Sequence, residues 1–329
     1  MNHERTNSTF TNQLEEAFEI ASKQSFKSPD RPIHNIVICG LGGSGIGAKI
    51  ASNWVQEEIA LPITLVNEYT LPGFVGPNTL VIGSSYSGNT EETTMALDEA
   101  KSKGAFIFGV TSGGHLAVFC ADNGYDCVIV PGGNPPRSAL AYSLVQLLNY
   151  FNKLGFISSK SLDQVQASIG LIRNNTLEID SMAQALSAYL FGKVGVLYGE
   201  TKYEGVVVRA RQQFNENSKY LAWNQVIPEM NHNELVGWGG GDERFAPVFF
   251  NAADIHPRNK KRFEITKDAV SKKSNAVFNL EAKGDSLIER SLYLIHLVDW
   301  ASYYLCERNH ADIMDIEIID YLKTELGKM

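Results

Sequence analysis

Short apolar runs alternate with longer stretches of helical periodicity over the first 130 residues. A helical stripe is expected at 11–26, and further helices at 45–57, 90–103 and 115–121. The apolar runs read as buried strands, and they lie at 36–39, 63–66, 80–83, 106–110 and 127–130. Strands that alternate with helices in this way predict an α/β fold, a doubly wound, flavodoxin-like parallel sheet with helices on both faces. Such sheets bind ligands at the carboxyl ends of their strands.

The second half of the chain repeats this order less regularly. Long helical patterns at 138–154 and 161–189 are expected to connect two lobes, and helices are also expected at 286–306 and 313–329. Strands are expected at 194–198, 226–228, 248–251, 262–265 and 277–280. We interpret this as a degenerate internal duplication offset by about half the chain. It predicts two domains, at 1–152 and 153–329.

Bulk properties narrow the function classes. The chain has 329 residues, 44% of them hydrophobic and 20% charged, and a formal net charge of −8. The negative charge makes a nucleic-acid or anionic-membrane surface unlikely as a partner. The four cysteines form no CxxC pair and no metal-like spacing with histidine, which predicts reduced, packed thiols and no metal site. The polar N-terminal residues and the absence of a long apolar run predict a cytoplasmic protein.

A glycine-rich turn joins the first predicted strand to the next helix, in the sequence HNIVICGLGGSGIGA at 34–48. Glycines let the backbone approach a ligand closely, and the unpaired N–H groups of a helix start attract anions. Gly43 and the hydroxyl of Ser44 lie in this turn. The turn therefore predicts a cradle for a phosphate or pyrophosphate.

This turn alone leaves three interpretations open. It satisfies G-x-G-x-x-G through Gly40, Gly42 and Gly45, and Glu68 lies at the distance where a dinucleotide fold places its ribose-binding acid. A phosphate ester, a dinucleotide and a glycine turn without any ligand are all compatible with it.

A second polar loop follows the strand at 80–83, in the sequence SSYSGNTEET at 84–93. One alternative is a polar loop that ends in a helix cap, but capping explains little of its hydroxyl density. Two hydroxyl-rich turns after two strands of one sheet can converge on a single phosphate, and a dinucleotide would not need the second one. This favours a phosphate monoester, with donors from Ser84, Ser85, Ser87 and Thr90.

These motifs resemble the sugar isomerase (SIS) domain, which binds phosphosugars. Together with NPPRSAL at 134–140 and NENSKYLAWNQVIPEMNHNELVGW at 215–238, they resemble the bifunctional phosphoglucose/phosphomannose isomerases over nearly the whole chain. The resemblance implies two SIS domains and a homodimer. It also implies interconversion of glucose 6-phosphate, and of mannose 6-phosphate, with fructose 6-phosphate, without a metal or cofactor.

An aldose–ketose isomerase opens the sugar ring and then moves a proton between C1 and C2. The resemblance implies that Glu216, in NENSK, is the carboxylate base; its alternative is a solvated helix acid paired with Lys219. His232, in PEMNHNE, matches the histidine that opens the ring, which related dimers take from the neighbouring subunit. Outside this motif a lone histidine is more often structural.

Two cations complete the expected site. Arg137, in NPPRSAL, could stabilise the enediolate; its alternative is a surface arginine, although a cation at a helix start opposes the macrodipole. Lys323, in DYLKTEL, matches a family lysine that reaches the substrate, and its alternative is a solvated helix lysine. The family often carries a small polar residue before that lysine, whereas this chain has IMDIEII at 313–319. The departure bears on mannose 6-phosphate, so the resemblance supports it less strongly than glucose 6-phosphate as a substrate.

Two other function classes stay open on sequence grounds. One is a non-catalytic phosphosugar sensor, which would have no use for Glu216 and His232. The other is an NAD-dependent enzyme that uses the glycine-rich turn, and titration with NADH would reveal its binding of the dinucleotide.

Overall fold

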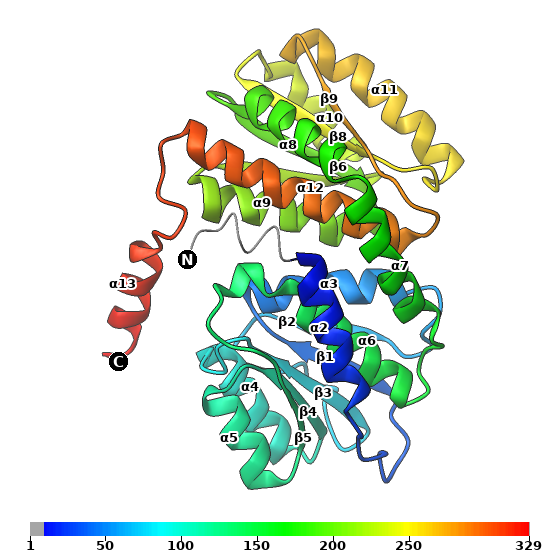
Figure 1. Ribbon diagram of the computed structural model, residues 1–329, viewed down its shortest axis with the longest axis vertical. Helices are drawn as coiled ribbons and strands as arrows, with labels where there is room; N and C mark the ends of the chain where they lie inside the picture. Colours follow the sequence, from blue (N-terminus) through cyan, green and yellow to red (C-terminus); the bar gives the residue numbers. More distant parts are fainter. Residues whose placement is uncertain (1–9, 329) are drawn as a thin grey trace.

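The computed structural model describes residues 10–328 and has two parallel β-sheets, one in each half of the chain (Figure 1). The first sheet has the order β2-β1-β3-β4-β5, which is the flavodoxin-like order. Its strands are β1 (Asn35–Cys39), β2 (Ile63–Val66), β3 (Thr79–Ser84), β4 (Phe106–Thr111) and β5 (Asp126–Ile129). The second sheet has the order β7-β6-β8-β9. Its strands are β6 (Val194–Glu200), β7 (Ala222–Ile227), β8 (Phe245–Asn251) and β9 (Phe278–Glu281).

Helices cover both faces of the first sheet, as the alternating pattern predicts. One face carries α4 (Glu91–Ser102) and α5 (Gly114–Asn123), which pack on the buried side chains of β1, β3 and β4. The other face carries α2 (Phe10–Ser22), α3 (Gly42–Val55) and α6 (Leu140–Lys153), and the short 3₁₀ turn η1 (Pro136–Ser138) precedes α6. Because the central strands β1, β3 and β4 are buried on both faces, they read as continuous apolar runs in the sequence.

The second sheet is sandwiched in the same way. One face packs on α8 (Thr176–Leu190), α9 (Glu204–Ser218) and α12 (Leu287–Arg308). The other packs on α10 (Glu234–Gly237), α11 (Pro257–Ser274) and η4 (Trp238–Gly240). The remaining elements are α7 (Lys160–Asn174), η2 (Thr201–Tyr203), η3 (Glu229–His232) and α13 (Glu317–Leu326). The predicted α/β class with two doubly wound sheets is confirmed.

Two details of the predicted element order are wrong. Residues 262–265 form no strand but lie inside α11, because Pro257 and the His256 side chain start a helix there and Phe263, Thr266 and Val270 then recur on its buried face. The single helix expected at 161–189 is two helices, α7 and α8, which meet at Asn175.

The two halves of the molecule meet where α3 crosses α9. Gly205 at the start of α9 lies against Ile50, and a Cβ at this glycine would come within 2.8 Å of the Ile50 Cγ1. The Gly205 N–H donates to the Asn53 Oδ1 at 3.0 Å, and Lys49 pairs with Glu204 at 3.1 Å. One continuous apolar core extends from α2 through this contact to α12 and contacts both sheets. The division into units 1–152 and 153–329 stays a prediction.

Helix α13 stands apart from both sheets in Figure 1, beyond the segment that leaves α12. None of its residues is buried, and its apolar side chains Ile318, Tyr321 and Leu322 are 76%, 62% and 56% exposed. An isolated helix of this length is marginal in water, and an apolar stripe of this kind usually packs against another surface.

Candidate active site

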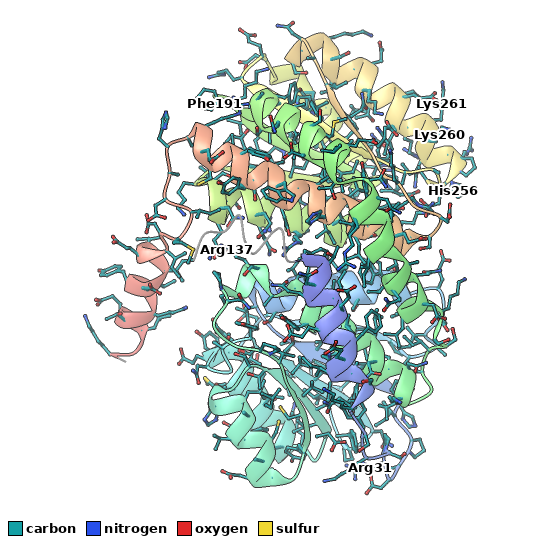
Figure 2. All side chains as sticks on the ribbon, viewed as in Figure 1. Arg31, Arg137, Phe191, His256, Lys260 and Lys261 are labelled. Atoms are coloured by element: carbon teal, nitrogen blue, oxygen red, sulfur yellow. The ribbon has the colours of Figure 1, made fainter. Side chains whose placement is uncertain are left out.

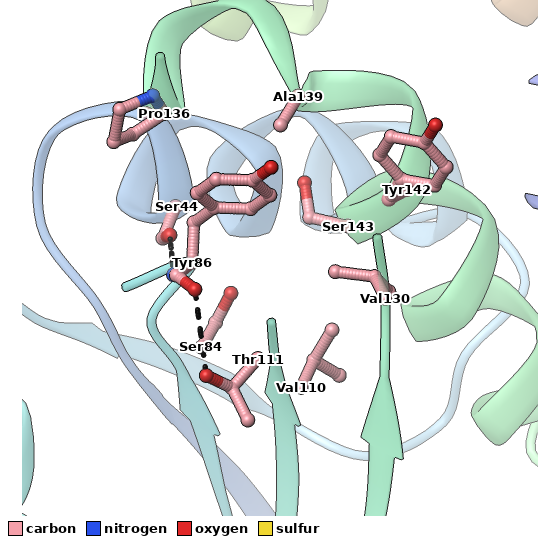
Figure 3. Close-up of a pocket in the computed structure, with 11 residues that line it drawn as sticks. Ser44, Ser84, Tyr86, Val110, Thr111, Val130, Pro136, Ala139, Tyr142 and Ser143 are labelled. Carbon is pink, nitrogen blue, oxygen red and sulfur yellow. Dashed lines mark hydrogen bonds between the residues drawn. The ribbon is translucent and has the colours of Figure 1, made fainter. Parts of the chain in front are cut away.

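The first two loops converge as their sequences predict. The Ser44 hydroxyl, in the first turn of α3, accepts a hydrogen bond from the Tyr86 N–H at 2.9 Å, so the glycine-rich turn and the 84–93 loop touch directly (Figure 3). Both loops follow the carboxyl ends of neighbouring strands, β1 and β3. The Tyr86 phenol donates to the Pro131 carbonyl at 2.8 Å and accepts from the Asn134 N–H at 3.2 Å, which fixes the second loop to the segment before η1.

The hydroxyls of the second loop are held in fixed positions. Ser85 and Thr90 share a hydrogen bond of 2.8 Å between their hydroxyl oxygens, and the Gly88 N–H donates to Ser85 Oγ at 3.1 Å. Ser87 is exposed, and its hydroxyl accepts from the Asn89 N–H at 3.2 Å. Thr90 makes no side-chain cap on α4, and Leu41 makes none on α3. Both helices therefore begin with N–H groups that no N-cap side chain satisfies, the arrangement that binds anions.

Close backbone packing accounts for the glycines of the first turn. A Cβ at Gly45 would lie 2.5 Å from the Gly40 carbonyl oxygen, and one at Gly40 would lie 2.7 Å from the Ser84 carbonyl oxygen. Gly42 has a φ of +53°, which few side chains adopt. The G-x-G-x-x-G spacing thus has a packing reason that needs no dinucleotide. Glu68, the expected ribose acid of that alternative, is exposed.

Gly43 serves a different contact. A Cβ at this position would lie 2.8 Å from the Pro136 carbonyl oxygen and 3.2 Å from the Arg137 nitrogen. The absence of a side chain at Gly43 is what lets η1, and Arg137 with it, lie directly on the glycine-rich turn.

Arg137 is buried, with 4% of its surface exposed, at the junction of the two halves (Figure 2). Its guanidinium donates from Nη1 to the Glu216 Oε1 at 2.9 Å and from Nε to the Asn217 Oδ1 at 2.8 Å. Its Nη2 donates to the Ile313 carbonyl at 2.7 Å. These three bonds are the reason for a cation at the start of a helix, and they make Arg137 an interior group instead of the surface arginine of the alternative interpretation.

Glu216, in the last turn of α9, faces a cavity of about 280 Å³ beside the glycine-rich turn. Its carboxylate pairs with Arg137 and keeps about a third of its surface exposed. Lys219 donates to the Glu216 carbonyl oxygen, at 2.9 Å, and forms no ion pair with its carboxylate. The cavity is lined by Gly42, Gly43, Ile46, Arg137, Arg209, Gln212, Gln213, Asn215, Glu216 and Ile319. A carboxylate, a guanidinium and the glycine-rich turn therefore line one cavity, although their sequence positions lie far apart.

A buried network behind this cavity escaped the sequence reasoning. The Arg209 Nη2 donates to the Asp299 Oδ2 at 2.7 Å and to the Arg137 carbonyl at 3.1 Å. The Gln213 amide donates to the other Asp299 oxygen at 2.9 Å. Burial raises the pKa of the Asp299 carboxyl, and the adjacent Arg209 guanidinium opposes that rise. The signal in the sequence is an aspartate inside the apolar helix 287–308, since a buried acid requires a cationic partner.

The other two predicted residues are not at this cavity. His232 ends η3 and is exposed, and Lys323 lies on the exposed helix α13. Neither lines a described cavity that Glu216 or Arg137 lines. Ile319 of α13 does reach the cavity edge, so the helix that carries Lys323 starts beside Glu216.

Two further features bear on the chemistry. Within residues 10–328, no group of three histidine, cysteine, aspartate or glutamate side chains is placed to hold a metal ion, and no helix is long and apolar enough to cross a membrane. Burial raises the pKa of the Cys39 thiol to about 12, so this thiol at the end of β1 is a packed, unreactive group.

Comparisons with known proteins identify the family of this chain. Residues 179–326 match the model of the bacterial phospho-glucose isomerase C-terminal SIS domain. The chain is 35% identical over 328 residues to a bifunctional phosphoglucose/phosphomannose isomerase of Caldicellulosiruptor bescii, and the match covers 96% of each chain. A protein of the same name from Thermoplasma acidophilum is 37% identical, over 89% of this chain and 90% of its own.

Solved structures share the fold at low sequence identity. A hypothetical protein from Thermus thermophilus superposes with a TM-score of 0.75 at 15% identity, covering 98% of this chain and 90% of the other. The C-terminal domain of glucosamine-fructose-6-phosphate aminotransferase from Francisella tularensis superposes with a TM-score of 0.68 at 14% identity, covering 94% of each chain. At such identities the likeness concerns the fold alone.

Proposed function

We propose that this chain, which belongs to the family of bifunctional phosphoglucose/phosphomannose isomerases, interconverts glucose 6-phosphate and mannose 6-phosphate with fructose 6-phosphate. The observation that carries the site assignment is the pairing of Glu216 with Arg137 at 2.9 Å in a cavity whose opposite wall is the glycine-rich turn. A sugar phosphate held by that turn would present its other end to a base and a cation. A non-catalytic sensor has no need of such a pair.

The phosphate group, in this proposal, binds to the N-terminal ends of α3 and α4. Gly43 and Ser44 supply donors from the first loop, and Ser85, Ser87 and Thr90 supply them from the second. The hydrogen bond from the Tyr86 N–H to Ser44 keeps the two loops together, so the donors are preorganised. The binding is local, because the chain as a whole is negatively charged.

Glu216 is the proposed base for the carbon step. Its carboxylate takes the proton from C2 of the open-chain aldose, the electron pair of the broken C–H bond forms the C1–C2 double bond, and the carbonyl electron pair moves to O1 to give the enediolate. The proton then returns to C1 as the carbonyl forms at C2, and the proton of the 2-hydroxyl passes to O1. The Arg137 guanidinium lies against the same carboxylate, and it can stabilise negative charge that develops on the enediolate oxygens. Because three hydrogen bonds fix this guanidinium, it needs little rearrangement as the charge appears.

Ring opening requires a group that exchanges a proton with the ring oxygen, and His232 is the proposed group. His232 is exposed on η3, outside the cavity of its own chain, which is what a histidine acting in a neighbouring subunit's site would require. We propose a homodimer in which each subunit supplies His232 to the other, and in which the exposed apolar residues of α13 are covered. Lys323 would then contact substrate from that helix.

Mixed dimers test the arrangement of the two subunits. Glu216→Gln and His232→Asn are each expected to be inactive, but refolding them together should give about a quarter of wild-type activity, since half the dimers are mixed and each holds one intact site. No recovery, with mixed dimers demonstrated by mass, would show that both residues act from one chain.

A coupled assay tests the activity itself. Fructose 6-phosphate formation would be measured from glucose 6-phosphate and, separately, from mannose 6-phosphate. Glu216→Gln is the test variant, and Glu229→Gln, an exposed acid of the neighbouring motif, is the matched control. Turnover of both sugars by wild type and control supports the proposal. No turnover of either sugar by wild type, with phosphosugar binding intact, would leave the sensor as the function.

A further inference from the structure

A second cavity, of about 1200 Å³, lies between the two halves and shares no lining residue with the Glu216 cavity. Its walls come from the end of α3, the start of α7, the end of β6 and the start of α12, together with the segment after β8. Helix α3 separates the two cavities: Gly43 lines the first and Asn53 the second, which is about 15 Å along the helix axis. The proposed isomerase chemistry leaves this second cavity unused.

The second cavity occupies the ligand position of the second sheet. In the order β7-β6-β8-β9, the chain leaves β6 toward one edge and returns as β8 on the other side, so the carboxyl ends of β6 and β8 form the switch point. Glu200 ends β6, and Asp254 follows the end of β8. The proposed phosphate loops hold the same position in the first sheet, after β1 and β3.

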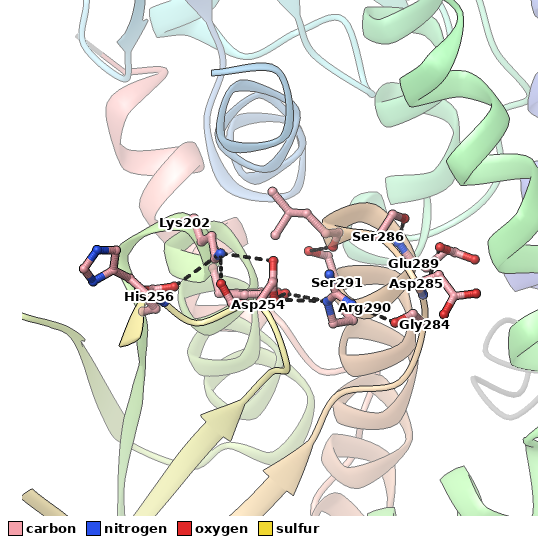
Figure 4. A network of polar contacts seen from close by, with 12 residues as sticks. Lys202, Asp254, His256, Gly284, Asp285, Ser286, Glu289, Arg290 and Ser291 are labelled. Atoms are coloured by element: carbon pink, nitrogen blue, oxygen red, sulfur yellow. Dashed lines mark hydrogen bonds and ion pairs between the residues drawn. The ribbon is translucent and has the colours of Figure 1, made fainter. Parts of the chain in front are cut away.

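A buried carboxylate oxygen at this switch point accepts no hydrogen bond. Glu200 is 4% exposed, and its Oε1 accepts from the His256 N–H at 3.0 Å and from the Asn259 amide at 2.7 Å. Its Oε2 accepts none. The nearest cation is Lys202, 3.5 Å away, but this ammonium donates to the Asp254 carbonyl and lies 3.0 Å from the Asp254 carboxylate (Figure 4). An oxygen left in this state is a candidate for contact with a ligand.

The surrounding groups decide the charge of that ligand. The carboxylates that line the second cavity outnumber its ammonium groups by five to two; the acids are Glu57, Glu58, Glu200, Asp254 and Asp285, and the cations are Lys160 and Lys202. Of the helix starts at this cavity, those of α11 and α12 are capped by side chains, since His256 accepts from the Arg258 N–H and Ser286 from the Glu289 N–H, whereas Ser159 makes no side-chain cap on α7. A phosphate would therefore meet net negative charge from the side chains that line the cavity.

We propose that the second cavity is a separate binding site for a small organic cation, a primary ammonium compound whose N–H groups donate to Glu200 Oε2 and to the carboxylates beside it. A hard metal ion is a poorer fit, because within residues 10–328 no three acid or histidine side chains converge as ligands. The amide and hydroxyl groups of Asn53, Gln164 and Thr201 are further polar contacts for the rest of such a molecule.

Calorimetric titration of the full chain tests this site. The probe is 1,4-diaminobutane, and 1,4-butanediol is the uncharged control of the same length. Glu200→Gln removes the charge of the buried oxygen, Asp285→Asn removes an exposed charge at the rim, and Glu264→Gln is the control, an exposed acid on α11 that pairs only with lysine. Thermal unfolding of each variant checks that it folds. If Glu200→Gln does not fold, binding to Asp285→Asn still decides the test.

Wild type is expected to bind the diamine saturably and not to bind the diol. Glu200→Gln should weaken the affinity for the diamine about ten-fold or more, Asp285→Asn should weaken it less, and Glu264→Gln should leave it unchanged. Saturating glucose 6-phosphate should leave this binding unchanged, because the two cavities are separate. Equal binding by wild type and the first two variants, competition by glucose 6-phosphate, or no heat up to about 10 mM diamine would each overturn the proposal. The isomerase assay is independent, so its failure would not be confused with failure here.

Discussion

Substituting Gly43 by alanine should impair catalysis while leaving the fold intact. The new Cβ would lie 2.8 Å from the Pro136 carbonyl oxygen, 3.0 Å from the Pro136 carbonyl carbon and 3.2 Å from the Arg137 nitrogen. All three atoms belong to the backbone, so no side-chain rotation can relieve the contact. The peptide that carries Arg137 must move away from the phosphate loop by a few tenths of an ångström.

That displacement acts on the group that we propose to stabilise the enediolate. Arg137 is held by Glu216, Asn217 and the Ile313 carbonyl, so its backbone cannot shift without disturbing these bonds. A misplacement of about 1 Å can reduce a rate about 100-fold, and a shift of roughly half that size predicts a fall of about ten-fold in kcat/KM, or about 1.4 kcal/mol.

Steady-state kinetics of the Gly43→Ala variant with glucose 6-phosphate measure this effect. Gly170→Ala in α7 is the matched control, because a Cβ there meets nothing within 4 Å. It should leave kcat/KM unchanged and raise the free energy of unfolding by up to about 1 kcal/mol, since alanine favours the helix. A Gly43→Ala variant with wild-type kcat/KM would refute the reasoning, because it would mean that the turn accepts a methyl group without moving Arg137.

Three further predictions concern buried ionisable side chains. Arg137→Lys should lower kcat about 100-fold with a smaller change in KM, measured by the same kinetics. Lysine keeps the charge but cannot form the three directed bonds, and an unchanged kcat would contradict the proposed stabilisation of the enediolate by Arg137. Asp299→Asn leaves the Arg209 charge buried without its counter-ion and should lower the free energy of unfolding by about 3–5 kcal/mol in urea titrations, and a loss under about 1 kcal/mol would count against a structural pair. Burial lowers the pKa of His296 from 6.5 to about 4, so the unfolded chain gains a proton there as the pH falls while the folded chain does not. The free energy of unfolding should therefore fall by about 3 kcal/mol from pH 7 to 4. His296→Phe should remove that part of the pH dependence in urea titrations, and a variant with the wild-type pH profile would contradict the prediction.

The first sheet could be predicted from the sequence because its central strands, β1, β3 and β4, are buried on both faces and its edge strands are short apolar runs. β1 to β5 are short apolar runs bounded by turns, and each was expected within one or two residues of its position. Residues 262–265 misled the same reasoning, since Phe263 and Ile265 flank a polar residue as in a half-buried strand, although Ile265 is 54% exposed. The helix there is set by groups outside the window, His256 and Pro257 at its start.

The site could be predicted in its parts but not in its geometry. The motifs around Arg137 and Glu216 identify both residues, but nothing in either motif indicates that a guanidinium and a carboxylate 79 residues apart form an ion pair. The pairing depends on how α3 packs on α9, which is decided by side-chain contacts between the two halves. Arg209 was missed for the same reason: the aspartate inside the apolar helix 287–308 indicates that Asp299 needs a cationic partner, but nothing in the stretch around Arg209 identifies it as that partner.

Isotope exchange tests the central claim, proton transfer by Glu216, most directly. Glucose 6-phosphate would be incubated in D₂O with wild type, with Glu216→Gln and with no enzyme. NMR would follow deuterium at C1 of the fructose 6-phosphate formed and at C2 of the glucose 6-phosphate regenerated by the reverse reaction. Wild type is expected to introduce solvent deuterium at these carbons, and Glu216→Gln, still able to bind the phosphosugar, is expected to introduce none above the enzyme-free control. Deuterium incorporation by Glu216→Gln at the wild-type rate would contradict the assignment of the base, and isomerisation by wild type without any incorporation would contradict an exchangeable enediol intermediate.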